Sequence, residues 1–115
     1  MSDLVDRYLA AWNAGPAERR SAVLAAFAPD VTYVDPLVEV RGQEQLEATI
    51  AAVQAQFPGF VFSALGEPDS HHGVARFGWG LGPAGAEPVV EGFDVVTLTG
   101  DRIGTVTGFL DKVPG

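Results

Sequence analysis

Apolar residues at the start of the chain recur at helical spacing. Over residues 3–13 they form one stripe, made up of Leu4, Val5, Tyr8, Leu9 and Trp12. This spacing predicts an amphipathic helix, and Gly15 stands where glycine commonly follows a last helical turn.

Two further helices are predicted before the middle of the chain. The second covers residues 17–27, with Val23, Leu24 and Phe27 facing inward, and Pro29-Asp30 closes it. The third covers residues 43–56, with an inward stripe of Leu46, Ile50 and Val53.

From Pro58 onward the apolar pattern changes to a period of two, which is typical of strands. Four strands are predicted, over residues 60–65, 74–81, 89–98 and 103–110, and turn-forming segments separate them. A short strand over residues 31–35 and an extended piece over 37–41 precede the third helix. Successive strands joined by short turns form an antiparallel meander. The sequence therefore predicts an α+β fold in which N-terminal helices pack against one face of a curved, mostly antiparallel sheet.

Composition limits the classes of protein to consider. The 115 residues suffice for one domain, expected over residues 1–115, and the apolar fraction of 47% suits a globular core. The formal net charge of -8 argues against binding to nucleic acid or to anionic membranes, which require basic surfaces. The chain has no cysteine, no charged-then-apolar leader after Met1 and no membrane-length apolar run. We therefore expect a cytoplasmic protein.

Asp35 ends an alternating run in which it shares a face with Val31 and Tyr33. If that face is buried, the carboxylate lies at the edge of an apolar surface, where desolvation produces a usable general acid or base. The other interpretation is that Asp35-Pro36 simply begins a turn. The dipeptide alone leaves both open.

Asp94 is a second carboxylate in an unexpected position, inside the strand predicted over residues 89–98. It shares a face with Val90 and Val96, whereas Glu91 lies on the opposite face, so one of the two acids must face the helices. A mid-strand aspartate on an apolar face needs a partner or a proton. Capping of a helix end or pairing with Arg76 would also satisfy it.

The sequence leaves the roles of Tyr8 and of the two histidines open. Tyr8 lies on the inward stripe of the first helix, where a phenol is either a core aromatic or a donor to a developing oxyanion. His71-His72 falls in a predicted turn, and adjacent imidazoles seldom converge on one ion. No metal-ligand spacing, nucleophile elbow or phosphate-binding glycine motif occurs, so we expect neither a metal nor a cofactor.

The predicted order of helices and strands resembles the nuclear transport factor two-like superfamily, in its SnoaL-like and ketosteroid isomerase-like branch. The resemblance rests on the segments at residues 7–15 (RYLAAWNAG) and 27–36 (FAPDVTYVDP), on Gly92-Phe93-Asp94 and on residues 108–111 (GFLD). It covers the chain essentially end to end. It implies a cone-shaped fold (an α+β barrel) that hosts both enzymes and binding modules.

The resemblance implies roles for three residues. Asp35 matches the base that moves a proton, Tyr8 matches the tyrosine of the oxyanion hole, and Asp94 matches the protonated acid that shares the hole. The implied reaction is isomerisation or cyclisation of a hydrophobic carbonyl compound, steroid-like or polyketide-like, without a cofactor or metal. Candidate lining or core residues are Trp12, Phe27, Phe60, Phe62, Phe77 and Trp79.

Two alternatives accompany this interpretation. A related cone hydrolyses epoxides with Asp and Arg, which Asp94 and Arg76 could imitate. The domain could also be a non-catalytic module for binding a hydrophobic ligand or for dimerisation.

Apolar residues occur on both faces of the strand over residues 89–98, which indicates that the outer face of the sheet is covered. We therefore expect a homodimer through the sheet.

Overall fold

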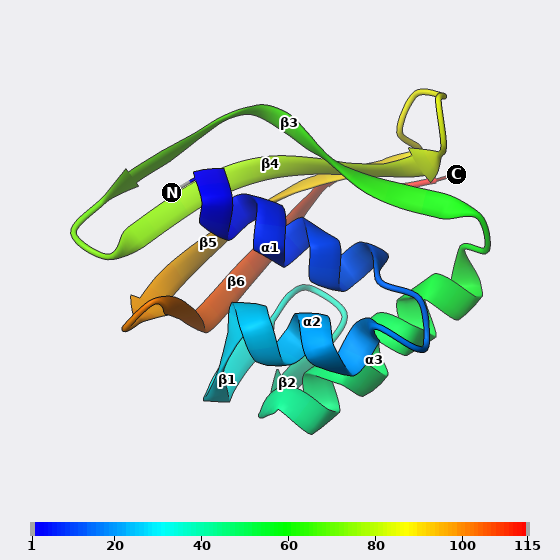
Figure 1. The fold of residues 1–115 in the computed structure, drawn as a ribbon. Coiled ribbons are helices and arrows are strands. Elements are labelled where there is room, and N and C mark those ends of the chain that lie inside the picture. The colour runs from blue at the N-terminus through cyan, green and yellow to red at the C-terminus, as the bar shows by residue number, and fades with distance from the viewer. Residues whose placement is uncertain (1, 115) are drawn as a thin grey trace.

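In the computed structural model, which describes residues 2–114, the chain folds into three helices and six strands (Figure 1). The helices are α1 (Ser2–Asn13), α2 (Arg19–Ala26) and α3 (Gln43–Gln56). The strands are β1 (Phe27–Val34), β2 (Glu39–Arg41), β3 (Phe60–His71), β4 (Val74–Pro83), β5 (Val90–Thr99) and β6 (Arg102–Lys112).

The six strands form one sheet in the order β2-β1-β6-β5-β4-β3. β1 and β6 run parallel, and the other neighbouring strands run antiparallel. The sheet curves, with its two edge strands β2 and β3 unpaired to each other, and the helices lie on its inner side, where β3 and β4 arch over α1 (Figure 1). This confirms the predicted α+β architecture of helices against a curved, mostly antiparallel sheet.

The second predicted helix is wrong at its C-terminal end. Helix α2 stops at Ala26, and Phe27 begins β1 opposite Ile103 of β6. Pro29 and Asp30 lie inside β1 instead of closing a helix. The β1–β6 register shifts between Phe27 and Thr32, and such an irregularity accommodates a proline that cannot donate to a ladder. Leu24, predicted to face inward, is 44% exposed.

Strand β3 extends well past its predicted end at Leu65 and reaches His71. The segment Glu67-Pro68-Asp69, predicted as a turn, lies within this strand. Instead of a turn, this segment produces an irregularity in the strand, where the β3–β4 register shifts between Leu65 and Asp69. Gly66 lies there with φ of 74°, a left-handed conformation that glycine adopts without steric cost.

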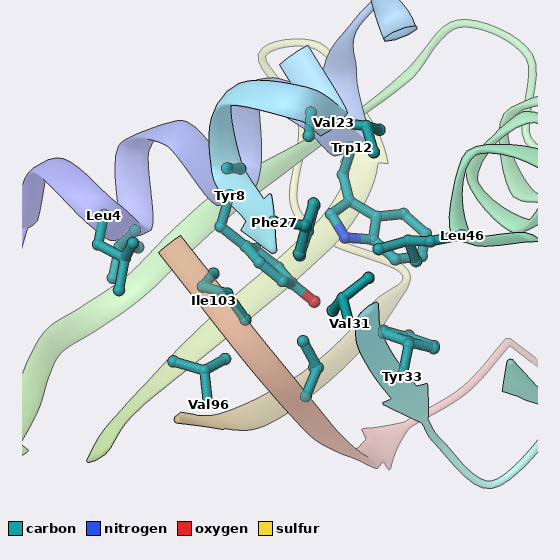
Figure 2. Close-up of a cluster of buried hydrophobic side chains, with 14 of the residues drawn as sticks. Leu4, Tyr8, Trp12, Val23, Phe27, Val31, Tyr33, Leu46, Val96 and Ile103 are labelled. Atoms are coloured by element: carbon teal, nitrogen blue, oxygen red, sulfur yellow. The ribbon is translucent and has the colours of Figure 1, made fainter. Parts of the chain in front are cut away.

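The core lies between the helices and the inner face of the sheet. Tyr8 and Trp12 of α1 pack with Phe27, Val31 and Tyr33 of β1 and with apolar residues of α3, β5 and β6 (Figure 2). Helix α3 has its predicted bounds and buries Leu46 and Ile50 completely, while Val53 is partly buried. In residues 2–114, no helix is both long enough and apolar enough to span a membrane.

Candidate active site

A cavity of about 290 Å³ opens between α1, the C-terminal end of α3 and the inner face of the sheet. Its lining includes the two carboxylates Asp35 and Asp94, and the 18 lining residues contain no lysine, arginine or histidine. The aromatic residues of its wall include Tyr8, Trp12, Tyr33, Phe57, Phe62 and Trp79. The lining residues are therefore mostly apolar or aromatic, and a small number are polar.

Asp94 lies deep in this cavity and is 2% exposed. The alternation of β5 buries Val90, Gly92, Asp94 and Val96 on one face, so Asp94 is the acid that faces the helices. Its carboxylate accepts a short hydrogen bond from the Tyr8 hydroxyl and one of 3.2 Å from Trp79 Nε1. Both oxygens of this buried carboxylate therefore have a donor.

Arg76 does not approach Asp94. It is exposed on the opposite face of the sheet, where its guanidinium lies 3.6 Å from the carboxylate of Asp69. The predicted alternative of an Asp94–Arg76 pair is therefore wrong, and the epoxide-hydrolysing arrangement that depended on it is absent. The strand alternation explains this result, since Arg76 is paired with Val95 and not with Asp94 in the β4–β5 ladder.

Burial shifts the proton equilibria of this cluster. Burial raises the pKa of Asp94 to about 6, the donors Tyr8 and Trp79 oppose the shift, and the nearby charge of Asp35 adds to it. Burial, together with the charge of Asp94, raises the pKa of Tyr8 well above its ordinary value, so this phenol stays protonated and remains a donor. Asp94 thus takes up a proton much more readily than an exposed aspartate does.

Asp35 follows the last residue of β1, where it lies both in a turn and at the wall of the cavity. Its Oδ1 accepts from the backbone N–H groups of Leu37 and Val38 at 2.8 Å and 3.0 Å, which closes a turn. Its Oδ2 accepts from the Tyr33 hydroxyl at 2.7 Å, and the side chain lines the cavity. The turn therefore fixes the carboxylate at the cavity wall.

Tyr33 belongs to the site although it was not among the predicted site residues. It is 5% exposed and lines the cavity. Burial raises the pKa of Tyr33 above its ordinary value, and the hydrogen bond to Asp35 adds to this effect. The signal was present in the sequence, because Tyr33 lies two residues before Asp35 on the same strand face. Its hydroxyl gives the site a second phenol beside that of Tyr8.

Gly108 of β6 connects the two acids. It pairs with Asp94 in the β5–β6 ladder, and a Cβ on it would lie 2.7 Å from Asp94 Oδ1 and 3.3 Å from Asp35 Cβ. Both side chains therefore converge on a position that carries no side chain. The parallel pairing of β1 with β6, which places Val34 opposite Thr107, brings Asp35 to this point.

The predicted aromatic residues divide between cavity and core. Trp12, Phe62 and Trp79 line the cavity. Phe27 and Phe77 lie in the core, with ring centroids 5.7 Å and 5.0 Å from that of Tyr8, and are not among the lining residues.

Phe60 and the histidines lie apart from the site. Phe60 packs on Phe57, with ring centroids 5.4 Å apart, and is also absent from the cavity lining. His71 and His72 stand at the exposed β3–β4 turn. Within the described part of the chain, no three His, Cys, Asp or Glu side chains are grouped so that they could hold a metal ion.

Comparison with known proteins gives a family and a set of solved structures. The family model described as the SnoaL-like domain matches residues 5–105. No curated protein matches the chain. A crystal structure of a candidate isomerase of the SnoaL-like family from Agrobacterium tumefaciens superposes with a TM-score of 0.89 at 42% identity, covering 95% of each chain.

Two more distant structures share the fold. A candidate polyketide cyclase from Sinorhizobium meliloti superposes with a TM-score of 0.74 at 20% identity, over 92% of this chain and 93% of that one. A candidate ketosteroid isomerase from Kribbella flavida gives a TM-score of 0.72 at 16% identity, over 98% of this chain and 78% of that one.

Proposed function

Because this chain belongs to the SnoaL-like family, we propose that it is a cofactor-independent isomerase or cyclase that acts on a hydrophobic carbonyl compound. One observation carries the proposal: two carboxylates in unequal surroundings face one apolar cavity. Asp35 accepts from three donors, whereas Asp94 is buried with a raised pKa. Two acids whose environments differ in this way are suited to separate acid and base roles.

In this proposal Asp35 is the base. It removes a proton from the carbon next to the substrate carbonyl, and the two electrons of the broken C–H bond move into the enolate. The hydrogen bonds from Tyr33, Leu37 and Val38 hold its carboxylate at the cavity wall in a fixed orientation. Return of the same proton to a different carbon completes an allylic isomerisation.

Asp94 and Tyr8 stabilise the oxygen on which negative charge develops. Protonated Asp94 donates its O–H to the enolate oxygen while it still accepts from Trp79. The Tyr8 hydroxyl reaches the same oxygen when it exchanges its bond to Asp94 for one to the substrate. A cyclase would use the same enolate as the nucleophile for an intramolecular aldol closure.

A non-catalytic binding or dimerisation module of the same fold is the second candidate. The observation that favours it is that Tyr8, Tyr33 and Trp79 all donate to carboxylates of the site itself. In that case Asp35 and Asp94 would orient a hydrophobic ligand without moving a proton.

Proton exchange separates the two candidates. A cyclic β,γ-unsaturated ketone in deuterated water is followed by NMR for deuterium entry and by ultraviolet absorbance for conjugation. We expect wild-type turnover and a loss of roughly 10²–10⁴-fold in Asp35→Asn, the usual contribution of a general base. Asp30→Asn is the matched control, because Asp30 is an exposed acid of β1 outside the cavity lining.

Two results would contradict the proposal in different ways. Unchanged turnover in a folded Asp35→Asn variant rules out Asp35 as the base. Binding of the ketone to the wild-type protein with no exchange at any carbon favours the binding module.

A further inference from the structure

We propose that the cavity selects compact carbonyl compounds of one or two rings, and that a row of three aromatic side chains, Trp12, Phe62 and Trp79, sets this limit. The carbonyl group in this statement rests on the proposed function. The limit on size rests on the wall and the volume of the cavity.

The aromatic row joins three elements along one side of the cavity. The ring centroid of Phe62 on β3 lies 5.3 Å from that of Trp12 on α1 and 5.6 Å from that of Trp79 on β4. All three side chains line the cavity, and Trp12 is 5% exposed. Rings at this spacing are in contact, so the row forms a continuous wall.

Trp79 is fixed at two points. Its Nε1 donates to Asp94 Oδ1, and its ring lies over Gly92 of β5 so closely that a Cβ there would be 2.7 Å from Cζ2. The absence of a side chain at residue 92 is what allows the indole to lie this close to β5. Rotation of the ring out of this position would leave a buried carboxylate oxygen without its donor.

Phe62 is fixed through its backbone by Asn13, the last residue of α1. Asn13 Nδ2 donates to the carbonyl oxygen of Phe62 at 2.9 Å, and its Oδ1 accepts from the Phe62 N–H at 2.7 Å. Gln54 of α3 donates to the carbonyl oxygen of Trp12 at 2.8 Å. Side chains therefore tie the backbone at Phe62 and at Trp12, so a bulky ligand cannot simply push this wall aside.

The volume of the cavity gives the size of its ligand. Its volume of about 290 Å³ lies just below the usual range for small-molecule sites, which begins at about 300 Å³. At the packing density of protein interiors, about 0.75, this space holds roughly a dozen non-hydrogen atoms of ligand. A one-ring or two-ring ketone fits within that number, whereas a four-ring skeleton leaves much of its apolar surface outside.

Ligand titrations test the limit without any need for turnover. The probes are a bicyclic octalone and a four-ring steroid enone, androstenedione, and tryptophan fluorescence or calorimetry measures the dissociation constant (Kd). We expect the octalone to bind the wild-type protein at least tenfold more tightly than the steroid. Phe62→Ala opens the wall, so we expect it to tighten steroid binding at least tenfold relative to octalone binding.

Phe60→Ala is the matched control, because Phe60 lies two residues earlier on β3 and does not line the cavity. We expect it to leave the preference between the two probes unchanged. Phe62→Leu makes a smaller opening and serves if the alanine variant does not fold.

Three outcomes would overturn the inference. The first is that the wild-type protein binds the steroid as tightly as the octalone. The second is that Phe60→Ala changes the preference between the probes as much as Phe62→Ala does. The third is that the wild-type protein binds neither enone. Octalone binding with the expected size preference, but without proton exchange, would contradict the proposed function and leave the inference intact.

Discussion

Gly108 and Asp94 face each other across the β5–β6 ladder with no room for a methyl group between them. In Gly108→Ala the new Cβ would meet Asp94 Oδ1 at 2.7 Å and would also press on Asp35, 3.3 Å away. We expect the carboxylates to shift apart, with a loss of about 1–3 kcal/mol in the free energy of unfolding, as is typical of overpacking. Urea denaturation measures this loss, and titration with octalone measures the accompanying loss of ligand affinity.

Gly15→Ala is the matched control for this substitution. The nearest atom to a Cβ on Gly15 is a carboxylate oxygen of Glu18, at the ordinary contact distance of 3.5 Å. We expect its unfolding free energy to remain within about 0.5 kcal/mol of wild type. Equal losses in the two variants would show that the close approach to Asp94 has no energetic consequence.

The two phenols of the site should differ in their contribution to stability. Tyr8→Phe leaves an oxygen of the buried Asp94 without its donor, which costs about 2–3 kcal/mol. Tyr33→Phe removes one of three donors from the partly exposed Asp35, which costs about 1 kcal/mol. Urea denaturation at neutral pH measures the free energy of unfolding of both variants. A larger loss of this free energy in Tyr33→Phe than in Tyr8→Phe would contradict the expected order.

Asp94 should make the protein less stable as the pH rises through the range of its titration. Its pKa is about 6 in the folded protein against an ordinary value of 3.8, so between these values the folded state binds more protons than the unfolded state. The unfolding free energy therefore falls as the pH rises from about 4 to about 6, by about 3 kcal/mol in total from this group.

The variant Asp94→Asn cannot titrate at this position and serves as the reference. Urea unfolding of both proteins at about pH 4 and about pH 7 gives two changes of stability, and their difference isolates the contribution of Asp94. Parallel changes in wild type and variant would show that the carboxylate does not take up a proton in this range.

The outer face of the sheet leads us to expect a homodimer. Phe93 and Phe109 stack there with ring centroids 4.8 Å apart, and the exposed Leu65 of β3 lies in the same row of the sheet, across Gly78 of β4. Phe93→Glu places a charge in the middle of this surface, so we expect the mass measured by light scattering to fall from two chains to one. Circular dichroism checks that the variant is folded, and a wild-type mass of one chain would contradict the expectation.

The period of the strands made it predictable which residues share a face with each acid. Alternation alone places Asp35 with Tyr33 and Asp94 with Val96, and the structure keeps both groupings. The bounds of α3 were equally predictable, because an apolar stripe covers its whole length and Gly42 precedes it.

Features that depend on distant pairing were not predictable. An apolar residue such as Phe27 satisfies a helix or a strand equally well, and its pairing with Ile103 decides between them. Trp79 was predicted as apolar lining or core, since its bond to Asp94 depends on the β4–β5 register and on the space over Gly92. In both cases the deciding partner lies in another strand.

The position of β6 between β1 and β5 has a consequence for the order of folding. During synthesis Asp35 and Asp94 both leave the ribosome before β6 does. Strands β1 and β5, which bring these acids into the site, each pair with β6 and are not neighbours in the sheet. The cavity is therefore completed by the last strand of the sheet. Because a ligand stabilises only the state that binds it, a ligand of this cavity would favour the fully assembled chain over every partly folded form.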